Sequence, residues 1–263
     1  MNNNVVVVPI YKNALSCYEE ISLTQCFHIF KNNDIVMVKP RHLNVNALLE
    51  KYPFDNVIVF DDHFFKDIHG YNELMLSSQF YQSFLSYQFM LIYQTDAYVF
   101  KDDLNYWCGL GFDYIGAPWL KPIKNSNAIK VAIFKLKSYW YTKFNVKRNG
   151  LPKSKQFYNK VGNGGFSLRN IKLFYELSIK EKKLADYYIG LRNLAFNEDL
   201  FWSIEINRKR KRLHIPNYKI ACKFSIETYP ETAFEINQEK LPFGCHAWEK
   251  HLDFWKDKIA GCL

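Results

Sequence analysis

The most informative stretch for predicting the fold is Phe89–Asp96, F-M-L-I-Y-Q-T-D. Its first five residues are all apolar, which is typical of a strand buried on both faces of a sheet. On both sides of this stretch, apolar runs predict further strands and amphipathic runs predict helices between them. The predicted strands cover 3–10, 34–38 and 56–60, and the predicted helices cover 14–30, 45–52 and 72–87. Strands that alternate with helices at this spacing predict an α/β protein with a parallel sheet.

The second half of the chain is less regular. We expect a strand at 166–168 and a helix that Asn170 caps and that runs to about 183. Asn197 opens a further predicted helix through 207. The segment 121–155 is basic and aromatic, which predicts an insertion or a surface helix. The whole chain, 1–263, is expected to be one domain that carries this insertion.

Composition narrows the class of protein. Apolar residues make up 48% of the chain and aromatic residues 17%, which excludes a disordered protein. No apolar run is long enough to span a membrane, and no basic signal-peptide start is present. The six cysteines are widely spread, so we expect reduced thiols in a cytoplasmic protein. The net charge of +9 favours an anionic partner: nucleic acid, an acidic membrane or a phosphorylated substrate.

Four places carry candidate chemistry. Asp96 follows the central strand, where a carboxylate can hold a divalent cation on a phosphate or simply cap a turn. Glu198 and Asp199 start a helix, so either one faces a cleft as a general base or both complement the helix dipole. The dipole would lower the pKa of Asp199, and partial burial would raise it. His246 follows a glycine turn and is a ligand or a structural histidine. The fourth is V-G-N-G-G-F-S-L-R-N, 161–170, where three glycines fall within four positions. They mark a loop entering a strand, or a backbone that a ligand approaches closely.

In combination, six segments resemble a known family. They are V-V-V-V-P-I-Y, Y-Q-T-D-A-Y-V-F, Y-I-G-A-P-W, G-N-G-G-F-S-L-R, N-E-D-L-F-W-S and L-P-F-G-C-H-A-W. The set resembles a family of bacterial proteins, long catalogued as a domain of unknown function, that is similar to nucleotide-sugar transferases of the GT-A fold. The resemblance covers about Val5 to Trp255. It implies a GT-A-like (Rossmann-like) α/β fold, with a mostly parallel central sheet and helices on both faces.

The resemblance also implies roles for residues. The donor nucleotide would be bound by Pro9, Ile10, Tyr11, Lys39, Asn72, Gln94, Thr95 and Asp96. Asp96 and His246 would be the metal ligands, although T-D-A has one carboxylate where the family pattern has two. The donor sugar and the acceptor would lie against Asn163, Gly164, Gly165, Arg169 and Trp119, with the glycines leaving room for a sugar ring. Asp199 would be the catalytic base, and Glu198 would bind an acceptor hydroxyl.

The resulting expectation is a metal-dependent, hexosyltransferase-like glycosyltransferase. It would move a sugar from a nucleotide donor, a UDP-sugar, to a glycan or lipid-linked acceptor in surface polysaccharide or lipopolysaccharide synthesis. A carboxylate and an imidazole favour Mn²⁺ over Mg²⁺ as the cofactor. Asp199 as the base favours inversion, while a retaining enzyme would not need it.

Three other classes remain open from the sequence. They are a weakly active or inactive glycan- or nucleotide-binding protein on this fold, a basic nucleic-acid-binding protein, and a phosphate-ester hydrolase. The segment 130–148 has two interpretations of its own. It either contacts a membrane surface through Tyr139, Trp140, Tyr141 and Phe144, or is a solvated helix with a half-buried aromatic face.

Overall fold

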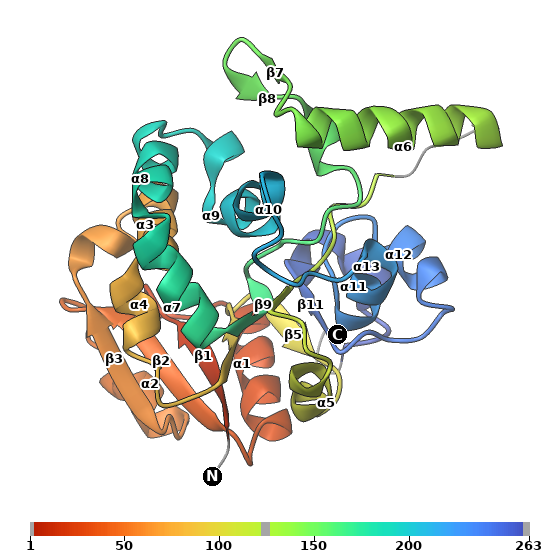
Figure 1. The fold of residues 1–263 in the computed structure, drawn as a ribbon. Coiled ribbons are helices and arrows are strands. Elements are labelled where there is room, and N and C mark those ends of the chain that lie inside the picture. Colours follow the sequence, from red (N-terminus) through yellow and green to blue (C-terminus); the bar gives the residue numbers. More distant parts are fainter. Residues whose placement is uncertain (1–2, 122–126, 260–263) are drawn as a thin grey trace.

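The computed structural model describes residues 3–121 and 127–259, and a six-stranded sheet lies at its centre (Figure 1). The order of the strands across this sheet is β3-β2-β1-β4-β9-β6, and only β9 runs antiparallel to its neighbours. The strands are β1 (Asn4–Pro9), β2 (Asp34–Pro40), β3 (Asn56–Phe60), β4 (Phe89–Tyr93), β6 (Tyr114–Ile115) and β9 (Phe166–Asn170). The predicted strands and the mostly parallel sheet are therefore confirmed.

Helices cover both faces of the sheet, as predicted. Alternate side chains of a strand point to opposite faces, so Val5 and Val7 of β1 pack in one core, and Val6 and Val8 pack in another. The first core lies under α3 (Ile68–Leu76), α4 (Ser78–Gln82), α7 (Ile171–Lys180) and α8 (Lys182–Gly190). The second lies under α1 (Cys17–Ile29), α2 (Asn46–Lys51), α5 (Leu104–Gly109) and α11 (Tyr218–Phe224). Burial on both faces explains why β4 is apolar at every position.

A smaller sheet continues from the carboxyl end of β4. Its order is β10-β11-β5, and β5 (Ala97–Val99) is antiparallel to β11 (Gly244–His246). The strand β10 (Ser225–Ile226) completes it, and α12 (Pro230–Ile236) and α13 (Leu252–Trp255) pack nearby around a third core. Because only three residues separate β4 from β5, the two sheets meet at the loop Gln94–Asp96.

Two helix predictions need correction. The helix expected at 72–87 is two helices, because the Ser77 hydroxyl accepts from the amide N–H of Phe80 and starts α4 as a new helix. Leu85, within the expected range, lies beyond the end of α4 and is 44% exposed. The helix expected from Asn197 to 207 begins there, with Asn197 as its N-cap, but it is not regular. A π-helical turn, Phe201–Glu205, separates α9 (Glu198–Leu200) from α10 (Ile206–Arg208). Such turns widen a helix locally and are frequent at functional sites.

The basic aromatic segment contains α6 (Ala128–Lys143), followed by a hairpin of β7 (Lys147–Arg148) and β8 (Leu151–Pro152). Residues 122–126 of the expected insertion lie outside the described part of the chain. Figure 1 shows α6 and this hairpin standing apart from the two sheets. One face of α6 packs on the turn Ser154–Phe157 and on Tyr158, whose ring lies edge-on to Phe134. Among the described residues, no helix is both long and apolar enough to cross a bilayer.

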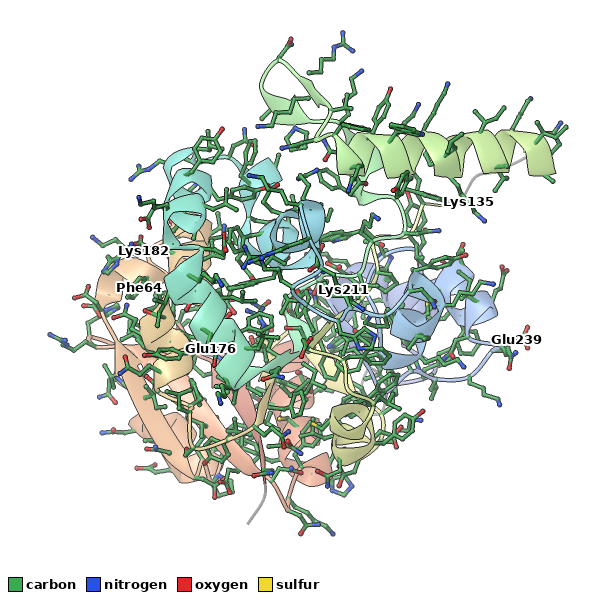
Figure 2. All side chains as sticks on the ribbon, viewed as in Figure 1. Phe64, Lys135, Glu176, Lys182, Lys211 and Glu239 are labelled. Carbon is green, nitrogen blue, oxygen red and sulfur yellow. The ribbon has the colours of Figure 1, made fainter. Side chains whose placement is uncertain are left out.

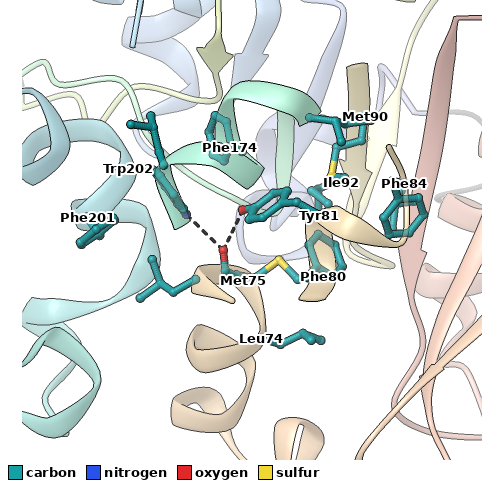
Figure 3. Packing of buried hydrophobic residues seen from close by; sticks show 14 of the residues in the cluster. Leu74, Met75, Phe80, Tyr81, Phe84, Met90, Ile92, Phe174, Phe201 and Trp202 are labelled. Carbon is teal, nitrogen blue, oxygen red and sulfur yellow. Dashed lines mark hydrogen bonds between the residues drawn. The ribbon is translucent and has the colours of Figure 1, made fainter. Parts of the chain in front are cut away.

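The first core extends to the segment that begins with Glu198. Trp202 Nε1 and the Tyr81 hydroxyl both donate to the carbonyl of Met75, at 3.2 and 2.7 Å (Figure 3). Trp202 also stacks on Phe174, with ring centroids 4.4 Å apart. The fully buried indole therefore fixes the π-helical turn, and the two acidic residues before it, against the sheet.

Candidate active site

Strand register brings three distant segments together. In the antiparallel pair β4–β9, Tyr93 lies opposite Phe166, so Gln94 meets Gly165, and the Gln94 N–H donates to the Gly165 carbonyl at 2.9 Å. In the pair β5–β11, Ala97 lies opposite His246. His246 is thus beside the loop that ends in Asp96. The site lies at the carboxyl end of a central parallel strand, the edge where open α/β sheets bind ligands.

His246 is the centre of the first cluster. Its Nε2 atom lies 3.1 Å from Asp96 Oδ1 and 3.1 Å from Gln94 Oε1, and its Nδ1 atom lies 3.5 Å from Glu227 Oε1. Burial alone lowers the pKa of this imidazole, but Asp96 and then Glu227 outweigh it and raise the pKa to about 10. Burial alone likewise raises the pKa of Asp96, while the charge and hydrogen bond of His246 bring it below its usual value.

Asp96 and His246 fit a divalent cation. Two neighbouring ligands of an octahedral ion with bonds of about 2.1 Å are roughly 3 Å apart, which matches the separation of Oδ1 and Nε2. Glu227 Oε1 lies 3.5 Å from the other ring nitrogen, where a carboxylate would orient the imidazole and leave Nε2 for a metal. The described residues contain no group of three His, Cys, Asp or Glu side chains suited to hold a metal. Within these residues Asp96 Oδ1 and His246 Nε2 form a candidate pair, with Gln94 Oε1 3.1 Å from Nε2.

The second cluster contains the two acidic residues. Arg169 Nη2 donates to Glu198 Oε1 at 3.1 Å, and both side chains are almost fully buried, with exposures of 0% and 4%. Arg169 also donates from Nη1 to the Tyr81 hydroxyl at 2.9 Å. The guanidinium of Arg169 is therefore buried and paired within the protein in this structure. Glu198 is held by this pair at one oxygen, and its N–H donates to Asn72 Oδ1.

Asp199 has a different environment from the one that its helix position predicts. Burial, followed by the neighbouring Glu198, raises the pKa of Asp199 well above that of an ordinary aspartate. Of the two opposing effects, burial therefore outweighs the helix dipole, because α9 has only three helical residues while the Asp199 Oδ1 atom is fully buried. A raised pKa makes a carboxylate a stronger base once it is ionised.

The glycine stretch separates the two clusters. A Cβ on Gly164 would overlap Asp199 Oδ1 and Glu198 Oε1, and a Cβ on Gly165 would overlap His246 Nε2. The absence of a Cβ at these two positions thus leaves room for the side chains of Asp199, Glu198 and His246. Because the Cα atoms of consecutive residues are only about 3.8 Å apart, the acidic pair and the imidazole contact adjacent residues. The Asn163 side chain accepts from the Gly165 N–H and holds this loop in place.

A small cavity adjoins Asp96 on the side of β1. It has a volume of about 260 Å³ and is lined by Tyr11, Lys12, Ser16, Tyr18, Glu19, Asp96 and Glu249. Lys12 Nζ lies 2.7 Å from Glu19 Oε2, and the Thr95 hydroxyl donates to Glu19 Oε1 at 2.8 Å. Pro9, Ile10 and Tyr11 line the neighbouring surface with Lys12 and Thr95. The cavity joins the loop after β1 to the aspartate loop.

Other predicted residues have structural contacts. The Lys39 ammonium donates to the carbonyls of Pro40 and Leu43, so its contacts are with its own loop. Asn72 is buried and contacts the acidic pair, as described above. Trp119 packs on Phe157 and borders Gly162 on the side toward Ser203.

A larger cavity, of about 470 Å³, lies between α6 and the π-helical turn. Its lining residues include Ser203, one helical turn after Asp199, and the basic residues Lys143, Lys160 and Arg208. Arg208 is paired with Glu205 at 2.7 Å, whereas no carboxylate of the described residues pairs with Lys160. Burial, and secondarily Arg208, lowers the pKa of Lys160.

Unpaired polar atoms gather around these clusters. Buried atoms without a hydrogen-bond partner in the described structure include Tyr71 OH, Glu198 Oε2, Asp199 Oδ1, Ser203 Oγ, Glu227 Oε2 and Glu249 Oε2. Buried polar groups are nearly always paired in folded proteins, so a concentration of exceptions indicates a place where a ligand or an ion is bound. Glu227, Lys12 and Tyr71 had no signal in the sequence, because only the fold brings them here.

The chain belongs to the family described as "Protein of unknown function (DUF5672)", whose model matches residues 55–246. No curated protein matches its sequence. Among solved structures, mouse xyloside xylosyltransferase 1 in its apo form is similar over 92% of this chain and 97% of its own, with 12% identity and a TM-score of 0.52. Core-mannan synthase A from Aspergillus fumigatus, in an Mn/GDP form, covers 76% of this chain and 66% of its own, with 8% identity and a TM-score of 0.47. The GT-A-like fold expected from the sequence is thereby confirmed.

Proposed function

We propose that this protein is a metal-dependent glycosyltransferase that transfers a sugar from a nucleoside diphosphate donor, a UDP-sugar, to a glycan or lipid-linked acceptor. The observation that carries the proposal is the convergence of Asp96, His246 and Asp199 around Gly164–Gly165, at the carboxyl end of β4. The fold supports the class of reaction, but the identity of the substrate depends on the residues of the site.

The donor would lie along the loops after β1 and β4. In this arrangement the nucleoside contacts Pro9–Tyr11, and the diphosphate lies near Asp96, with Lys12 at the edge of the same cavity. Asp96 Oδ1 and His246 Nε2 would hold Mn²⁺ or Mg²⁺, which offsets the charge that develops on the leaving diphosphate. The imidazole must lose its proton to bind a metal, and Glu227 remains to orient it.

Asp199 would take the proton from the attacking acceptor hydroxyl. Asp199 must be ionised to act, so its raised pKa makes it a strong base only in the molecules in which it has lost its proton; such a base contributes roughly 10²–10⁴-fold to the rate. Arg169 pairs with Glu198 at Oε1, and the second oxygen, Oε2, would accept from an acceptor hydroxyl. Attack from the side of Asp199, opposite the diphosphate, inverts the anomeric configuration.

The acceptor would enter through the larger cavity, whose wall includes Ser203 one turn beyond the base. Lys143, Lys160 and Arg208 make this cavity suitable for a phosphorylated or carboxylated acceptor. These basic side chains favour a glycan linked to a lipid phosphate as the acceptor. We propose that the enzyme acts in the cytoplasm, in the synthesis of a surface polysaccharide or lipopolysaccharide.

A second candidate is a nucleotide- or glycan-binding protein on the same fold. It is favoured by one observation, that the described residues offer two metal ligands of the usual types and no third. Both candidates have the donor site, but only the glycosyltransferase would transfer the sugar.

A thermal-shift screen of nucleoside diphosphates and nucleotide sugars, with and without Mn²⁺, tests the proposal. A ligand at about 100 times its Kd stabilises the folded state by about 2.7 kcal/mol, or roughly 5 °C or more for a chain of this size. We expect this shift with a uridine diphosphate only when Mn²⁺ is present, and its loss in Asp96→Ala and His246→Ala. If no nucleotide shifts the midpoint, the donor site does not exist. If the shift occurs but no sugar is transferred or hydrolysed, the second candidate is correct.

A further inference from the structure

The outer face of α6 carries a stripe of exposed apolar side chains. Ile129, Ile133, Leu136, Trp140 and Phe144 are between 49% and 70% exposed. Their spacing of four, three, four and four residues places them on one side of the helix. Trp140 and Phe144 stack on each other with ring centroids 5.0 Å apart.

The rest of the described chain leaves this stripe uncovered, because it contacts the opposite face of α6. On that opposite face Ser138 is buried, and the Thr142 hydroxyl donates to the Gln156 carbonyl at 2.9 Å. Figure 2 shows the outer side chains of α6 projecting away from the rest of the molecule. The helix is therefore apolar on two faces, and only one of them has a partner within the described structure.

The charge around the stripe has a single sign. Residues 114–175 contain eleven lysines and two arginines and no aspartate or glutamate. On α6 itself, Lys137 and Lys143 are next in sequence to Leu136 and Phe144, so they border the stripe at about 100° per residue. Lys130, Lys137 and Lys143 form no ion pair with a described carboxylate.

We propose that α6 binds the headgroup region of an anionic lipid membrane, with this stripe inserted between the lipids. The stripe is roughly 22 Å long, and apolar residues bordered by lysines along one helix face are the pattern of a helix that lies in the membrane surface. A second copy of the chain is disfavoured, since it would bring two acid-free basic segments together. Nucleic acid would use the lysines but would leave the apolar side chains in water. The proposal holds whichever reaction the active site performs.

Membrane binding would also orient the cavity behind α6. Tyr139 is exposed on the helix and lines that cavity together with Lys143. A lipid-linked molecule in the same membrane would therefore be close to the cavity entrance when α6 is bound.

Co-sedimentation with phosphatidylcholine vesicles, with and without phosphatidylglycerol, tests this inference on the full chain. We expect binding only to the vesicles that contain phosphatidylglycerol. Ile133→Gln with Trp140→Gln should weaken it roughly tenfold or more, because two large side chains no longer enter the lipid. Lys130→Gln with Lys137→Gln should weaken it by a similar factor, since each lysine near an anionic surface contributes about fivefold.

Matched controls lie on α7, away from α6. Ile179 is 52% exposed there, and Ile179→Gln should bind as the parent protein does. Lys172→Gln with Lys180→Gln removes two exposed charges and should have less effect than the α6 pair. Circular dichroism and the thermal midpoint show whether each variant is folded.

The outcomes separate the alternatives. No binding to anionic vesicles, or unchanged binding by Ile133→Gln with Trp140→Gln, overturns the proposal. A chain that binds DNA or RNA through the same lysines but not vesicles, or that dimerises through the stripe, overturns it as well. Loss of vesicle binding in these variants should leave nucleotide-induced stabilisation intact, so failure of one proposal is distinguishable from failure of the other.

Discussion

The two clusters on either side of Gly164–Gly165 each contain two carboxylates and one basic side chain, but different groups in them have shifted pKa values. In the first, one imidazole lies between two carboxylates, Asp96 and Glu227, and its pKa is raised to about 10. In the second, the guanidinium of Arg169 pairs with Glu198 alone, and the pKa of the neighbouring Asp199 is raised. The first cluster therefore has an excess of negative charge that attracts a cation. The second has one carboxylate more than its cation neutralises, so that carboxylate tends to hold a proton.

The difference shows how one buried cation, Arg169, gives the neighbouring Glu198 and Asp199 different environments. Arg169 pairs with Glu198 and not with Asp199, so of these two adjacent residues Asp199 is left without a basic partner and has a raised pKa. When their environments separate the pKa values of two carboxyl groups, the two groups commonly have separate roles in catalysis. The comparison can be tested by changing one member of each cluster at a time.

The largest effect is expected from Asp199→Asn on sugar transfer. The amide keeps the shape of the side chain but cannot accept the proton, so the transfer rate should fall by roughly 10²–10⁴-fold. The measurement is transfer at saturating donor and acceptor, with the nucleotide-induced thermal shift as the check that the donor site is intact. Transfer close to that of the parent protein would remove Asp199 from the role of base.

Arg169→Met should cause the largest loss of stability. It leaves Glu198 charged and buried without its partner, and breaking a buried pair in this way costs about 3–5 kcal/mol. Urea unfolding measures the loss. Lys182→Met is the matched control, because it breaks an exposed pair with Asp186 that is worth at most about 1 kcal/mol. Equal losses in the two variants would mean that Arg169 does not stabilise Glu198.

Glu227→Gln should act on the metal and not on the fold. Residues that orient a metal-binding imidazole typically change metal affinity by roughly 10–100-fold, and the Glu227 carboxylate faces His246 Nδ1. The affinity for Mn²⁺ is measured by titration in the presence of uridine diphosphate. Glu231→Gln, an exposed change on α12, is the control. An unchanged affinity in Glu227→Gln would show that this carboxylate does not orient the imidazole.

Much of the fold follows from local sequence. Four apolar strands and their helices were predicted because β1 and β4 are buried on both faces and their runs are uninterrupted. The helix boundary at Ser77 was missed because a side-chain cap competes with an otherwise continuous apolar pattern. The π-helical turn after Asp199 was missed because one extra residue per turn leaves no clear mark in the spacing.

The candidate site was only partly predictable. Asp96, Asp199, His246 and the glycines were selected from motifs, but what brings them together is the register of β9 on β4 and of β11 on β5. Register between strands more than 70 residues apart is a tertiary property that no local pattern encodes. For the same reason Arg169 was expected at a sugar, although its position on β9 points it into the core.

The smallest effect expected is a gain in stability, again from Asp199→Asn. The folded chain holds the Asp199 proton at pH values where the unfolded chain, with an ordinary aspartate pKa of about 3.9, has released it. The parent protein therefore loses stability as the pH rises from about 4 toward the raised pKa of the folded state. Asparagine resembles the protonated carboxyl and does not titrate, so the variant should be the more stable of the two at pH 7 and nearly equal to the parent at pH 4. Urea unfolding at the two pH values measures this, with Asp186→Asn as an exposed control. A variant that is less stable than the parent at pH 7 would mean that Asp199 is ionised and well paired in the folded chain. In that case the contrast between the two clusters would not hold.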